Sequence, residues 1–89
     1  MANVRDLKKD INFVLGDIIE AVYVWEFNNT DKGTEKSEAI INEAITTFDE
    51  LIAKVNAKNV EDKKAHFKTI RQELEKDGRD LIEKVNKLD

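Results

Sequence analysis

The sequence predicts an all-α protein, an antiparallel three-helix bundle, and three observations support this fold class. Apolar residues recur at three- and four-residue spacings along most of the chain. Proline, the residue that helix interiors tolerate least, is absent. Polar segments interrupt the apolar pattern twice and divide it into three stretches. We therefore expect residues 1–89 to form one domain, with helices at about 3–27, 35–57 and 60–88 that run up, down and up.

The first helix is expected over residues 3–27, with Asn3 placed to cap its N-terminus. Leu15 and Val22 widen a core stripe made of Val4, Leu7, Ile11, Val14, Ile18, Ala21 and Trp25. Residues 22–25 are rich in β-branched and aromatic side chains, which favour strands. The helical spacing nevertheless continues through them, so we expect helix as far as Phe27.

A loop is predicted at residues 28–33, which include several turn formers and no apolar residue. Thr34 is then placed to cap the second helix. The core stripe of the second helix consists of Ile41, Ala44, Ile45, Phe48, Leu51, Ile52 and Val55. That of the third helix consists of Val60, Phe67, Ile70, Leu74, Leu81, Val85 and Leu88.

A turn near residues 56–59 separates the second and third stripes, because continuing the second stripe leads to polar residues. One bent helix is the alternative. Gly78 falls on the core side of the third helix, where we expect it to make room for a large neighbour. Trp25 is one candidate for that neighbour. A helix break after Asp77 is the alternative.

Composition and charge exclude several classes of protein. The net charge of −4 argues against a surface built throughout for nucleic acid or anionic lipid. The absence of cysteine excludes disulfides, thiolate metal sites and cysteine nucleophiles. Residues 1–10 do not resemble a signal peptide, and acidic residues break the most apolar stretch, 11–27. We therefore expect a cytoplasmic protein with no membrane partner.

Nothing in the sequence indicates an enzyme, a cofactor or a metal site. There is no glycine-rich phosphate loop and no nucleophile elbow, and the carboxylates fall on faces that we expect to be solvated. The only histidine, His66, follows Asp62 by one helical turn, which predicts a local ion pair instead of a metal site.

A second apolar row on the first helix, opposite its core stripe, is the most informative feature. Gly16 on this row would let another backbone approach closely, and an exposed apolar stripe often marks an interface. The row consists of Phe13, Gly16, Glu20, Tyr23, Val24 and Phe27. The alternative is that the bundle covers this row itself, with Tyr23 and Phe27 under the loop at 28–33. The leading hypothesis is a non-catalytic protein that binds itself, as in a homodimer, or another protein through this row.

The alternative function is that of a nucleic-acid-associated regulator. One flank of the third helix is basic and carries Lys64, Lys68, Arg71 and Arg79. Glu75 interrupts this flank, and no aromatic residue interleaves with it to stack on bases. A solvated surface that pairs with acidic neighbours, including Glu43 and Glu50, explains the flank better. Nucleic acid is therefore the less favoured partner.

Overall fold

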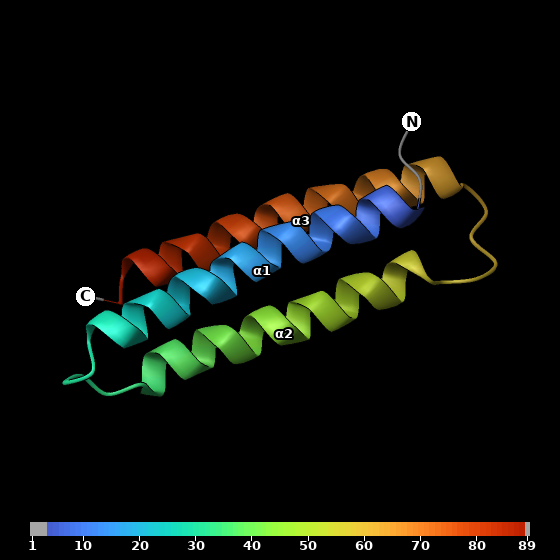
Figure 1. The fold of residues 1–89 in the computed structure, drawn as a ribbon. Helices are drawn as coiled ribbons and strands as arrows, with labels where there is room; N and C mark the ends of the chain where they lie inside the picture. The colour runs from blue at the N-terminus through green and yellow to red at the C-terminus, as the bar shows by residue number, and fades with distance from the viewer. Residues whose placement is uncertain (1–3, 89) are drawn as a thin grey trace.

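The computed structural model describes residues 4–88 and contains three helices, α1 (Val4–Asn28), α2 (Glu35–Val55) and α3 (Lys63–Asn86). Figure 1 shows α1 and α3 running in the same direction and α2 running against them, in an elongated bundle. Each helix packs against the other two, and the described residues include no strand. The predicted antiparallel three-helix bundle is confirmed. Its extents are 51 × 20 × 17 Å, so the long helices determine the shape.

The helix ends agree with the expected ones within a few residues. Helix α1 continues to Asn28, so the stretch at 22–25 is helical as expected. The cap expected at Asn3 lies outside the described residues. Thr34 occupies the N-cap position of α2, but its side chain donates to the Glu38 carboxylate (3.2 Å) and makes no capping bond to the described backbone.

The connection between α2 and α3 spans residues 56–62, so the alternative of one bent helix is wrong. Asn59 adopts a positive φ of 63°, which reverses the chain locally. Asp62 caps α3 by accepting a hydrogen bond from the Ala65 N–H (3.1 Å). The cap lies after Val60, and α3 therefore begins at Lys63, later than the expected residue 60.

The core lies along the axis of the bundle and takes residues from all three helices. Its buried apolar members are Leu7, Ile11, Leu15, Ile18, Val22, Ile40, Ile41, Ala44, Leu51, Val55, Ile70, Leu74, Leu81 and Leu88. Three positions in the expected stripes are exposed, Val4 and Ala21 on α1 and Ile45 on α2. Ile45 follows the buried Ala44 and is rotated from it by about 100° around the helix axis. The buried line of α2 passes instead through Ser37 and Ile40, which the expected stripe left out.

Ser37 is the one buried polar side chain among the described residues. Its hydroxyl lies 2.5 Å from a carboxylate oxygen of Glu26 on α1 and 2.9 Å from the carbonyl oxygen of Thr34. A buried hydroxyl without a partner would be costly. This contact joins the end of α1 to the start of α2, so the register of these two helices is set partly by a polar bond.

Gly78 is buried where α1 and α3 meet, and α3 continues through it without a break. A Cβ atom at this position would lie 3.0 Å from the Cγ1 atom of Val14. The neighbour that needs the space is therefore Val14, and not Trp25, which packs partly buried against the core. The glycine allows α1 and α3 to approach closely in the middle of the bundle.

Candidate functional site

The outer face of α1, defined as Phe13, Gly16, Glu20, Tyr23, Val24 and Phe27, lies on the side of the helix away from the core. All six residues are exposed. The exposed fractions of the large apolar side chains are 56% for Phe13, 55% for Tyr23, 54% for Val24 and 82% for Phe27. The loop at 29–34 therefore does not cover Tyr23 and Phe27. The structure leaves an apolar face on α1 that its own fold does not bury.

Gly16 has a different environment from Gly78. A Cβ atom built at Gly16 meets no described atom within 4 Å, apart from its own helix. The packing of the bundle therefore gives no reason for a glycine at this position. A glycine in a helix interior costs about 1 kcal/mol of stability relative to alanine.

Charge is distributed unevenly along α1. Basic side chains lie in its N-terminal half, at Arg5, Lys8 and Lys9, together with Asp6 and Asp10. The charged residues of its C-terminal half are all acidic: Asp17, Glu20 and Glu26. The helix dipole favours the opposite arrangement, with cations near the C-terminus, and the last turn of α1 has none. The stability of α1 alone therefore does not explain this distribution.

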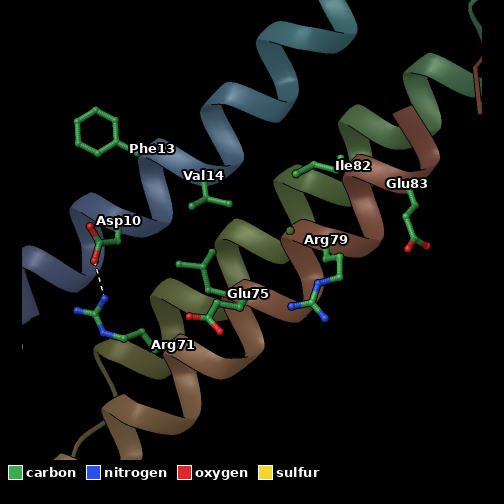
Figure 2. A pocket seen from close by; sticks show the side chains of 10 residues that line it. Asp10, Phe13, Val14, Arg71, Glu75, Arg79, Ile82 and Glu83 are labelled. Atoms are coloured by element: carbon green, nitrogen blue, oxygen red, sulfur yellow. Dashed lines mark hydrogen bonds and ion pairs between the residues drawn. The ribbon is translucent and has the colours of Figure 1, made fainter. Parts of the chain in front are cut away.

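A surface groove of about 560 Å³ runs along the contact between α1 and α3, beside Phe13 (Figure 2). Val14, Leu74 and Gly78 line its apolar part, and the half-exposed Ile82 lies on its α3 side. Arg71 on α3 binds the carboxylate of Asp10 on α1 at 2.8 Å, the contact drawn dashed in Figure 2. Apolar surface thus continues from the outer face of α1 into this groove.

The basic flank expected on α3 does not form a continuous cationic strip. Arg71 is paired with Asp10, and Arg79 lines the groove together with Glu75 and Glu83. Two arginines and three carboxylates therefore share the groove, which does not favour a phosphate backbone. Lys64 and Lys68 are exposed beyond it. Glu43 does pair with a lysine of α3, but with Lys84 (2.6 Å), which is outside this flank.

His66 is placed differently from the expectation. Its Nε2–H donates a hydrogen bond to the carbonyl oxygen of Lys54 on α2 (2.7 Å). The carboxylate of Asp62 instead caps α3 through the Ala65 N–H. His66 therefore joins the end of α2 to the start of α3. Within residues 4–88, no group of three His, Cys, Asp or Glu side chains is arranged to hold a metal ion.

The opposite flank of α3 holds a charged cluster against α2. Glu73 accepts a hydrogen bond from Lys54, which raises the pKa of that lysine. Partial burial raises the pKa of the Asp77 carboxyl, and the neighbouring carboxylates of Glu73 and Asp80 raise it further. These contacts hold α2 against α3 and form no enclosed site.

Comparison with known proteins adds no assignment, because the chain matches no protein-family model, no curated protein and no solved structure. In the part of the chain that the structure describes, each helix is too short or too polar to cross a membrane. A functional assignment therefore depends on the side chains of this chain itself.

Proposed function

We propose that this chain is a non-catalytic interaction protein that docks a protein surface, either a second copy or a different protein, on the outer face of α1. The observation that carries the proposal is the exposure of three aromatic side chains on one helix face, with Phe27 more than four-fifths exposed. Scattered single apolar residues are normal on protein surfaces, whereas several large apolar side chains gathered on one helix face are typical of an interface.

The apolar area of this face gives association a driving force similar in size to its costs. Aromatic side chains bury about 150–250 Å² each, so Phe13, Tyr23 and Phe27 together expose roughly 400 Å². Removing this area from water is worth about 10 kcal/mol before the costs of association are subtracted. Those costs are about 4–15 kcal/mol, so we expect reversible binding of moderate affinity.

Glu20 sets a chemical condition on the partner. Its carboxylate lies in the middle of the apolar row, between Phe13 and Tyr23. Covering the row would remove water from this carboxylate, which is costly unless the partner supplies a cation or a hydrogen-bond donor. A suitable partner therefore combines an apolar surface with a basic side chain.

The test replaces Tyr23 and Phe27 together by glutamate and uses Ile45→Glu as the matched control. Ile45 is an exposed apolar residue on α2, outside the outer face of α1. We expect both variants to keep the helical circular dichroism of the parent chain. Only the Tyr23→Glu/Phe27→Glu variant should lose association, measured as solution mass and as proteins recovered with the tagged chain from its native host.

Two results would contradict the proposal. If the Tyr23→Glu/Phe27→Glu variant unfolds while Ile45→Glu remains folded, the two aromatic residues support the core and do not form a docking face. If both variants retain every association of the parent chain, the outer face of α1 is not the site of contact.

A further inference from the structure

We infer that the outer face of α1 binds a second copy of this chain, with the two α1 helices antiparallel and a two-fold axis beside Gly16. This inference rests on the proposed function and adds to it the identity of the partner, the direction of its helix and the register. Three features of α1 support it: the position of Gly16, the distribution of charge and the placement of Lys9 over the ring of Phe13.

Gly16 is the midpoint of α1, with twelve of its 25 residues on either side. In a symmetric antiparallel pair, the residue beside the axis faces its own copy. A glycine there would allow the two backbones to approach closely. This close approach explains the glycine, for which the packing of the bundle gives no reason. Pairing about the midpoint also overlaps the two helices over their whole length.

The charges of α1 are complementary to those of a reversed copy. The N-terminal half of α1, with three basic and two acidic side chains, would lie beside the C-terminal half of the second chain, whose charged residues are all acidic, and the reverse. Glu26 already binds Ser37 of α2, so Asp17 and Glu20 are the carboxylates left for this contact. At a rise of about 1.5 Å per residue, Lys9 lies about 10 Å on one side of Gly16 and Glu20 about 6 Å on the other. In the antiparallel pair, Lys9 is therefore offset by only about 4–5 Å along the axis from Glu20 of the second copy. Lys9 is thus the cation that a covered Glu20 requires.

Phe13 and Lys9 of one copy meet Glu20 of the other copy in the same arrangement. Phe13 lies about 4–5 Å from the axis on one side, and Val24 lies about 12 Å from it on the other. Reversal of the second helix places each Phe13 between Phe13 and Val24 of the other copy and nearest to Glu20 of that copy, about 1–2 Å away along the axis. Lys9 already lies over the ring of Phe13, with Nζ 5.7 Å from the ring centroid. The ammonium group is therefore held near the place where Glu20 of the second copy would arrive.

A parallel pair fits these features less well, because it would place Lys9 beside Lys9 and Glu20 beside Glu20 of the second copy. Like charges facing each other across an interface oppose binding. The aromatic area of two copies is roughly 800 Å², which is in the range of small, transient contacts. We therefore expect a weak, reversible dimer.

The test is a charge exchange measured by sedimentation equilibrium of the full chain over a wide range of concentration. Lys9→Glu and Glu20→Lys should each weaken the dimer by about tenfold or more, since each places like charges together on both sides of the axis. The combined Lys9→Glu/Glu20→Lys variant should recover the parent affinity, and so should an equal mixture of the two single variants. Lys58→Glu, in the connection between α2 and α3, is the matched control and should leave the affinity unchanged.

The outcomes separate this inference from the function on which it rests. The parent chain could remain a monomer at every concentration and still bind a different protein through Tyr23 and Phe27. In that case the inference of a second copy is wrong, and the proposal of a docking face on α1 is retained. If neither association occurs, both proposals fail. If a dimer forms that neither single variant weakens, the antiparallel pairing is wrong. In that case Phe27→Cys, in a chain that has no other cysteine, would cross-link a parallel dimer but not an antiparallel one.

Discussion

The two faces of α1 carry similar residues and have opposite environments. The inner face contributes Leu7, Ile11, Leu15, Ile18 and Val22 to the core, each less than 5% exposed. The outer face carries Phe13, Tyr23, Val24 and Phe27, each more than half exposed. Both faces show the three- and four-residue spacing of a helix stripe. Only the inner one is covered, because α2 and α3 both pack on the same side of α1.

This difference shows that hydrophobic periodicity measures how much apolar surface a helix offers, and not which part of it the fold uses. A helix in a three-helix bundle has two neighbours, which cover one side of it. Helix α1 offers more apolar surface than two neighbours can bury. The apolar surface that remains exposed on the outer face of α1 is therefore better explained by a function other than folding.

The largest expected effect comes from truncating one residue on each face. Leu15→Ala should lower the free energy of unfolding by about 2–5 kcal/mol, because it removes a fully buried side chain and leaves a cavity. Phe27→Ala should change it by no more than about 0.5 kcal/mol, because the ring is mostly in water. Urea denaturation at a concentration where the chain is monomeric, followed by circular dichroism, measures both. Equal losses would mean that the two faces contribute alike to the core.

A smaller effect separates the two glycines of the helix interiors. Gly16→Ala should raise the free energy of unfolding of the monomer by about 1 kcal/mol, since the new methyl group meets no described atom outside its helix. Gly78→Ala should gain less or lose stability, since its methyl group would press against Val14. Thermal unfolding of the two variants beside the parent chain gives the comparison.

The same glycine substitution also tests the outer face. Gly16→Ala should weaken the antiparallel dimer while it stabilises the monomer, because the methyl group would separate the two backbones. If the substitution stabilises both, close approach of two backbones does not account for the glycine at this position.

The smallest effect concerns the charge of Asp77, on the α2–α3 side of the bundle. Because the pKa of Asp77 is raised above its ordinary value of 3.8, the folded state holds this proton more tightly than the unfolded chain does. The contribution of Asp77 to the free energy of unfolding therefore falls as the pH rises from 3.8 to the higher pKa of the folded state. Asp77→Asn should be slightly more stable than the parent chain near neutral pH, and this advantage should shrink on acidification below that pH range.

Denaturant titrations at several pH values measure the Asp77→Asn effect. An advantage for Asp77→Asn that grows on acidification would mean that folding lowers the pKa of Asp77 instead of raising it. Glu73 and Asp80 oppose ionisation of Asp77, while Lys76 and Lys54 favour it. The difference between variant and parent is therefore expected to be modest.

Much of the fold could be predicted because it depends on local spacing. The three helices, the two connections and continuous helix through Gly78 follow from apolar periodicity and turn residues along the chain. The burial of Ser37 and the exposure of Ile45 could not be predicted in this way. Both depend on how α2 is rotated toward two neighbours at once, and Ser37 is buried because Glu26, eleven residues earlier on another helix, meets its hydroxyl.

The outer face of α1 was recognised from the sequence as a row of residues, but its exposure was not determined there. The sequence by itself determined that α1 has two apolar faces, a central glycine and an uneven distribution of charge. Only the tertiary structure decided which face is buried, that Val14 rather than Trp25 needs the space at Gly78, and that Gly16 has no such neighbour. The physical reason is that spacing along a helix is a local property, whereas burial depends on the helices that pack against it.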